Sequence, residues 1–153
     1  MTNAASTVDK SKTAESMKVG KRLVELLDQG ESLKAIEELY ADTVTIHEAM
    51  SPGDVPGNED LPPEAQAAHK EGFVSKAEVL KSNQWFLENH EFHGGSQDGP
   101  YPLGDEFVVF MHLDCTPKVG PMAGQRMDMK EACIYKVDNG KIVESKFCYS
   151  MEF

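Results

Sequence analysis

The last third of the chain contains three segments in which apolar and polar residues alternate. They span residues 105–116, 126–137 and 141–151, and no helical pattern interrupts them. Asp-Asn-Gly at 138–140 separates the last two, and Asn-Gly is the pair most typical of a two-residue hairpin turn. A period of two is the pattern of strands that bury one face. The chain must therefore build an antiparallel sheet from its C-terminal end.

Helical patterns are confined to the first 90 residues. Residues 13–29 carry apolar side chains at helical spacing, and Gly30 supplies a stop because glycine enters the left-handed cap conformation freely. A second short helix begins at Ser32. Ser-Lys-Ala-Glu at 75–78 is a capping box, which predicts a third helix running to about Asn89.

Two less regular segments complete the order of elements. Residues 42–49 are mostly β-branched and predict a strand, and residues 91–99 predict an irregular strand followed by a turn at 100–104. Helices early and adjacent strands late favour an α+β fold over a parallel one. The expected architecture is a curved antiparallel sheet packed against about three helices.

The segment 51–73 differs in composition, with four prolines, several glycines and many acidic residues. A loop of this length in a small domain is either a lid over a pocket or a disordered linker, and one helical turn is expected at 63–68. Residues 1–12 have the polar composition of a tail. We therefore expect a single domain over 13–153.

Charge and cysteine content limit the partners of the protein. Of 153 residues, 15 are Lys or Arg and 26 are Asp or Glu, giving a net charge of −11. Such a surface repels phosphate backbones and anionic lipids, so we expect no nucleic acid or membrane partner. An odd number of cysteines, three, without a Cys-x-x-Cys pair indicates buried thiols in a reducing, cytoplasmic setting. No apolar run is long enough to cross a membrane, and residues 1–12 lack the apolar stretch of a signal peptide, so we expect neither.

Several of these features together resemble a known family. They are the N-terminal helix pair, Leu-Tyr-Ala-Asp at 39–42 running into a strand, a mid-chain helix with aromatic residues near its end, and Asp-Asn-Gly-Lys-Ile at 138–142. In this order and spacing the chain is similar, over roughly 18–149, to the SnoaL-like group of the nuclear transport factor 2-like superfamily.

The resemblance implies a cone-shaped half-barrel with a deep pocket, and usually a homodimer formed by sheet faces. It does not imply one reaction, because the superfamily includes polyketide cyclases, steroid isomerases, epoxide hydrolases, dehydratases and binding modules. The loop 51–73 is longer and more acidic than the resemblance leads us to expect. The Tyr-Asp pairing of the steroid isomerases cannot be matched to this sequence.

Two carboxylates fall on strand faces that are otherwise apolar. Glu131 alternates with the apolar side chains of 126–137, and Glu48 follows Val44 and Ile46. Burial of a carboxylate raises its pKa, as acid–base catalysis often requires. Glu131 and Glu48 are therefore the candidate catalytic residues. Alternatively, either reaches solvent or pairs with a basic neighbour, for which Lys130, Lys146 and Arg126 are the candidates.

The same faces supply the expected lining of a pocket. The predicted lining residues are Val44, Ile46, Trp85, Phe107, Val109, Met111, Met127, Met129, Cys133 and Tyr135. Methionines at these positions suit either a simple core or a pocket for a flat, apolar ligand. Phe110 falls on the opposite face, where a second subunit would cover it.

The histidines give no metal motif. His90 and His93 would face opposite sides of a strand, and their spacing is not the helical His-Glu-x-x-His of zinc enzymes. Capping of a helix end by His90 is the simpler interpretation. His47 and His112 fall on outward faces, and His69 lies in the acidic loop. We expect neither a metal nor a cofactor.

The sequence thus favours a protein that binds a small apolar molecule in a central pocket. If catalytic, it is a cofactor-independent isomerase, cyclase or hydrolase that uses Glu131 and Glu48 as acid and base. The alternative is a non-enzymatic binding or dimerisation module whose interior is filled by side chains.

Overall fold

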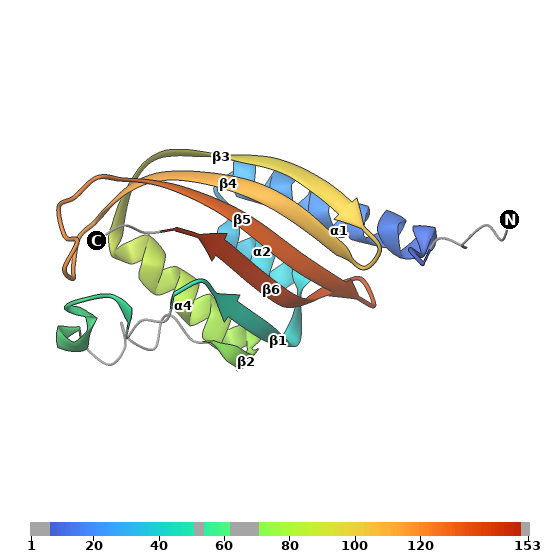
Figure 1. The fold of residues 1–153 in the computed structure, drawn as a ribbon, viewed down its shortest axis with the longest axis horizontal. Helices are drawn as coiled ribbons and strands as arrows, with labels where there is room; N and C mark the ends of the chain where they lie inside the picture. The colour runs from blue at the N-terminus through green and yellow to red at the C-terminus, as the bar shows by residue number, and fades with distance from the viewer. Residues whose placement is uncertain (1–6, 51–53, 62–70, 151–153) are drawn as a thin grey trace, which may run out of the picture.

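The sheet expected from the sequence dominates the structure. A computed structural model describes residues 7–50, 54–61 and 71–150, and these form a curved six-stranded sheet with three α-helices against one face (Figure 1). The helices are α1 (Lys10–Asp28), α2 (Ser32–Leu39) and α4 (Lys76–Glu88), with a 3₁₀ turn, η2, at Asn58–Asp60. The strands are β1 (Tyr40–Glu48), β2 (Gly72–Ser75), β3 (His90–Leu103), β4 (Glu106–Pro117), β5 (Met127–Asp138) and β6 (Lys141–Tyr149). The predicted α+β class is confirmed.

The sheet is mixed rather than purely antiparallel. Its strand order is β2-β1-β6-β5-β4-β3, and β1 and β6 run parallel while the other neighbours are antiparallel. The chain passes from β1 to its antiparallel neighbour β2 and then crosses through α4 to β3 at the opposite edge of the sheet. It adds β4, β5 and β6 in turn, until β6 lies parallel beside β1. This arrangement brings the first and last long strands together.

Several boundaries differ from the sequence prediction. Helix α1 begins at Lys10, inside the segment expected as a tail, because an Asp9 carboxylate oxygen accepts the Ser11 N–H at 2.9 Å and caps it. Strand β3 continues through the segment predicted as a turn at 100–104, since β4 supplies partners as far as Leu103. The short strand β2, which pairs with β1, was not predicted.

Two local predictions are confirmed. The Ser75 hydroxyl accepts the Glu78 N–H at 3.2 Å, and the Glu78 carboxylate accepts the Ser75 N–H at 3.1 Å, which completes the capping box of α4. Asn139 and Gly140 have φ of 50° and 73°, the left-handed pair that a tight hairpin turn requires.

The hydrophobic core lies where α1 and α2 cover the sheet. Its members include Leu23 and Leu26 of α1, Leu39 of α2, and Phe107 and Tyr135 of the sheet. The ring centroids of Phe107 and Tyr135 are 5.0 Å apart. Helix α1 approaches the sheet so closely at Gly20 that a Cβ there would stand 2.6 Å from Cβ of Pro100. This end of the sheet face is closed by packing.

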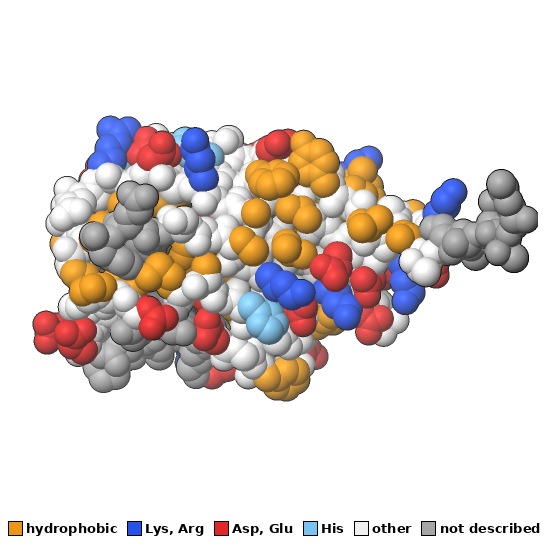
Figure 2. Space-filling model, in the orientation of Figure 1, with side chains coloured by type: hydrophobic (Ala, Val, Ile, Leu, Met, Phe, Trp, Pro, Cys, Tyr) orange, Lys and Arg blue, Asp and Glu red, His pale blue; other side chains and the backbone are white. Residues whose placement is uncertain are grey.

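The outer face of the sheet carries an apolar patch. Figure 2 shows hydrophobic side chains gathered over β3 and β4, bordered by charged residues. Among the exposed large side chains are Tyr101, Leu103 and Phe110, which are 52%, 68% and 50% exposed. The Tyr101 and Phe110 rings are in edge contact, with centroids 5.9 Å apart.

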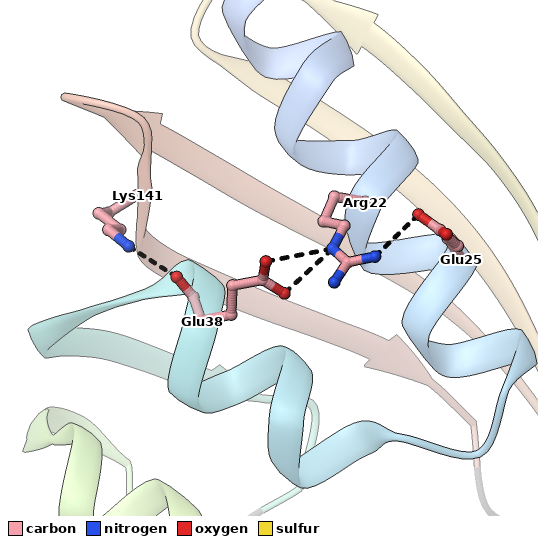
Figure 3. A network of polar contacts seen from close by, with 4 residues as sticks. All are labelled: Arg22, Glu25, Glu38 and Lys141. Atoms are coloured by element: carbon pink, nitrogen blue, oxygen red, sulfur yellow. Dashed lines mark hydrogen bonds and ion pairs between the residues drawn. The ribbon is translucent and has the colours of Figure 1, made fainter.

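Polar contacts join α1, α2 and the hairpin between β5 and β6 at the surface (Figure 3). Arg22 donates to Glu38 at 3.0 Å and to Glu25 at 3.0 Å, and the Lys141 ammonium donates to the Glu38 carbonyl at 2.6 Å. Exposed pairs of this kind contribute about 0–1 kcal/mol each. These contacts therefore contribute little to the stability of the fold.

The loop expected at 51–73 is described in part. Residues 54–61 carry the 3₁₀ turn η2, and the helical turn expected at 63–68 lies outside the described residues. Among the described helices, none combines the length and the apolar character needed to span a membrane.

Candidate functional site

A cavity of about 820 Å³ lies between the sheet and the helices, beyond the end that α1 and α2 close. Its apolar wall includes Ile46 of β1, Trp85 of α4, and three methionines of β4 and β5, namely Met111, Met127 and Met129. These five are the predicted lining residues that the structure places at the cavity. The volume falls within the usual range for small-molecule sites.

The other five predicted lining residues lie in or beside the packed core. Val44, Phe107, Val109, Cys133 and Tyr135 are all buried members of the core cluster and are not among the residues that line the cavity. They share the inward face, as predicted. Strand alternation indicates which face a residue takes, but only the position of the helices decides where along the strand that face is covered.

Both predicted carboxylates reach the cavity. Glu131 lies directly opposite Met111 of β4 on one side and Tyr149 of β6 on the other, and all three line the cavity. Glu48, at the end of β1, also lines it, and its Oε2 accepts a hydrogen bond from the Tyr149 hydroxyl at 2.9 Å. Tyr149 thus stands beside Glu131 and binds Glu48, so residues from β1, β5 and β6 form one polar group on an apolar wall.

Tyr149 was missed from the sequence because of a β-bulge. Counting back from the Asn-Gly turn in regular register would place Glu131 opposite Cys148. The register shifts by one residue between Lys136 and Val137, and the shift brings Tyr149 to Glu131 instead. No feature of the sequence marks this bulge.

Burial sets the protonation of the two carboxyl groups. Burial raises the pKa of Glu48 to about 7, the Tyr149 hydrogen bond opposes the rise, and the charge of Glu131 adds to it. Burial also raises the pKa of Glu131, against a weak hydrogen bond from the Cys133 thiol at 3.7 Å. The pKa values of Cys133 and Tyr149 are raised as well, chiefly by burial. Around neutral pH the cluster of Glu48, Glu131 and Tyr149 therefore holds exchangeable protons.

Within the described residues, no Lys or Arg forms an ion pair with either carboxylate. Two of the basic neighbours considered above have other partners, since Arg126 binds Asp114 at 2.7 Å and Lys146 binds Glu144 at 3.3 Å. The third, Lys130, lies opposite His112 of β4. Glu131 and Glu48 are thus not neutralised by a cation of the described chain.

The histidines are dispersed. His93 bonds the Thr116 hydroxyl at 2.8 Å, His112 contacts Asp128, and His47 lies 3.7 Å from Glu144. His90 lines the cavity, and so does His112, although the sequence predicts an outward face for His112. His69 lies outside the described residues. Across residues 7–50, 54–61 and 71–150, no three His, Cys, Asp or Glu side chains are grouped so that they could hold a metal ion.

Comparison with known proteins identifies the family. The model of the SnoaL-like domain family matches residues 14–149. The chain belongs to this family. A cavity between a curved sheet and its helices is what the resemblance to SnoaL-like proteins led us to expect. No curated protein matches the chain significantly.

The fold of this SnoaL-like chain is similar to solved structures of proteins with several different descriptions. A protein from Mesorhizobium loti, described as a proposed SnoaL-like polyketide cyclase and, in brackets, as a carbohydrate phosphatase, is 36% identical. The TM-score is 0.68, over 86% of this chain and 97% of that one. A nuclear transport factor 2-like protein from Burkholderia thailandensis is 16% identical, with a TM-score of 0.65 over 88% and 90%.

A Mycobacterium tuberculosis epoxide hydrolase of the LEH-like type is 10% identical, with a TM-score of 0.58 over 91% of this chain and 85% of that one. At such identities the last two show the SnoaL-like fold alone. The range of their descriptions agrees with the rule that a fold does not fix a reaction.

Proposed function

We propose that the protein binds a small, largely apolar molecule in the central cavity and transfers a proton next to a carbonyl group, as isomerases and cyclases do. The observation that carries the proposal is the pairing of Glu131 and Glu48 around Tyr149 on an apolar wall. A binding or dimerisation module would be expected to fill this space and to neutralise Glu131 with a basic neighbour. An open cavity and carboxylates without a cationic partner in the described chain favour the enzyme.

The surroundings of the two carboxylates suggest separate roles. Glu131 has only the weakly donating Cys133 thiol as a hydrogen-bond partner among the described residues, so its carboxylate is free to take a proton from carbon. Glu48 has Oε2 occupied by Tyr149, and its pKa of about 7 leaves it protonated in much of the population at neutral pH. The Glu48 proton then stabilises the enol oxygen, and Glu131 returns its proton to the same or another carbon.

The first test is deuterium exchange into the α position of an apolar ketone. In deuterated water the protein should exchange the α protons of tetralone faster than buffer, with saturation, as followed by proton NMR. The rate should rise with pH through the raised pKa of Glu131. It should fall again as pH passes about 7, because the Glu48 side of the pair loses its proton there. A panel of one- to three-ring ketones that exchange no faster than in buffer would contradict the proposal.

We also propose that the outer face of the sheet forms a homodimer in the cytoplasm. The exposed patch of Tyr101, Leu103 and Phe110 supports the dimer, and three unpaired cysteines suit a reducing compartment. Phe110→Asp should reduce the mass in sedimentation from twice 16.9 kDa to that of one chain, because a charge in the centre of an apolar interface loses its hydration. Phe73→Asp, at an exposed aromatic residue of β2, is the control. A wild-type protein that sediments as a monomer would exclude this interface.

A further inference from the structure

A second functional group of the cavity lies away from the carboxylates. His90 follows the end of α4 and opens β3, and it lines the cavity together with Trp85, Phe86 and Phe92. Its ring stacks on Phe86, with centroids 4.0 Å apart and planes at 27°. The Trp85 and Phe92 rings each stand 6.3 Å from it. We call the part of the cavity formed by these four residues the aromatic end.

The hydrogen bond of His90 fixes its tautomer. Nδ1 lies 2.9 Å from the Phe86 carbonyl oxygen. A backbone carbonyl can only accept, so Nδ1 must carry a hydrogen, and the neutral ring then has its lone pair on Nε2. No described residue forms a hydrogen bond with Nε2. The capping interaction expected at the helix end is present, and it leaves one ring nitrogen as an open acceptor.

The surroundings keep this ring uncharged. Burial lowers the pKa of His90, and the charge of Lys118 lowers it further, against the Phe86 carbonyl, which raises it. Lys118 comes from the segment after β4 and donates to the Glu88 carbonyl at 3.1 Å. At neutral pH, Nε2 is therefore an acceptor rather than a donor.

The aromatic end is well separated from the carboxylates along the sheet. His90 lies opposite Pro117 of β4, whereas Glu131 lies opposite Met111 of the same strand. Six residues of strand correspond to about 20 Å before curvature of the sheet shortens the distance. A ligand that contacts both regions must be long. The part of the ligand that stacks at the aromatic end must be flat.

We propose that Nε2 of His90 accepts a hydrogen bond from a hydroxyl group of the ligand, and that the protein thereby selects flat, unsaturated molecules with a phenol or enol at the end remote from Glu131. The inference rests on the proposed function for the cavity being a ligand site. The inference adds the chemical group of the ligand that the protein recognises at the aromatic end. His90 is a binding residue in this proposal and takes no proton from carbon.

Naphthol and methoxynaphthalene test the proposal, because they share a flat ring system and an oxygen but only naphthol donates a hydrogen bond. By titration calorimetry at neutral pH, wild-type protein should bind naphthol about tenfold more tightly, the value of one ordinary hydrogen bond. In His90→Phe, which keeps an aromatic ring, the ratio should fall to about one while methoxynaphthalene binding stays within about twofold. His93→Phe, at a histidine outside the cavity lining, should keep the wild-type ratio.

Nitrogen-15 NMR of wild-type histidines gives a second readout that needs no variant. The His90 resonances should show the Nδ1–H tautomer at neutral pH, and Nε2 should shift when naphthol is added. An Nε2–H tautomer, or a naphthol preference that survives in His90→Phe, would overturn the proposal. If neither compound binds, the ligand site itself fails together with the proposed function. If tetralone exchanges but the affinity ratio is one in wild type, only the role of His90 fails.

Discussion

Glu131→Gln is expected to reduce the α-proton exchange of tetralone by about 100- to 10,000-fold, the range typical of losing a general base. Glutamine keeps the shape of the side chain and can still bond the Cys133 thiol, but it cannot take a proton from carbon. The strand neighbours Met111 and Tyr149 need no rearrangement, because glutamate and glutamine side chains are nearly the same size. The loss should appear in kcat more than in KM, since the change removes chemistry and leaves the apolar wall intact.

Stability provides the internal control for this variant. The folded protein holds the pKa of Glu131 above its ordinary value, so ionising this group costs stability at pH values above 4.5. Glu131→Gln removes that cost, and the urea midpoint at neutral pH should be equal to or higher than that of wild type. Glu91→Gln, at an exposed carboxylate of β3 outside the cavity lining, should change neither the exchange of tetralone nor the urea midpoint. Unchanged exchange in a folded Glu131→Gln protein would leave a ligand-binding role without catalysis by this residue.

Phe107→Ala should cost about 3–5 kcal/mol of unfolding free energy, the usual range for truncating a buried aromatic ring. The Phe107 ring is completely buried, stacks on Tyr135, and lies 3.0 Å from where a Cβ on Gly20 of α1 would stand. Helix and sheet meet so closely here that the surroundings have little room to collapse into the space left by the ring. Urea or thermal unfolding measures the loss.

The same variant tests whether Phe107 belongs to the packed core or to the cavity wall. Phe73→Ala, at a ring that is 76% exposed, should change the free energy by only about 0.5 kcal/mol. If Phe107 lined the ligand cavity, as the sequence alone predicts, truncation would enlarge an existing space. It would then change ligand affinity more than stability. A cost below about 1.5 kcal/mol for Phe107→Ala would contradict its place in the packed core.

Local chemistry made the helices and the last hairpin predictable. The capping box at 75–78 and the Asn-Gly turn act through residues adjacent in sequence, so their structures follow from the residue types. Segments stabilised by residues far away in the sequence were harder to predict. Residues 100–103 contain two prolines and were predicted as a turn, yet they extend β3 because β4 lies beside them. The short strand β2 exists only because β1 offers it a free edge.

The sequence by itself determined which residues share a strand face, and thus that Glu131 and Glu48 lie among apolar side chains, because side chains alternate along an extended backbone. Only the tertiary structure decided which part of that inward face stays open. Helices α1 and α2 cover Phe107 and Tyr135, whereas the wall at Met111 and Met129 borders the cavity. It also decided that Tyr149, through a bulge in the hairpin, stands between the two carboxylates. Register and helix placement depend on contacts between residues far apart in the chain, and a periodic pattern carries no record of them.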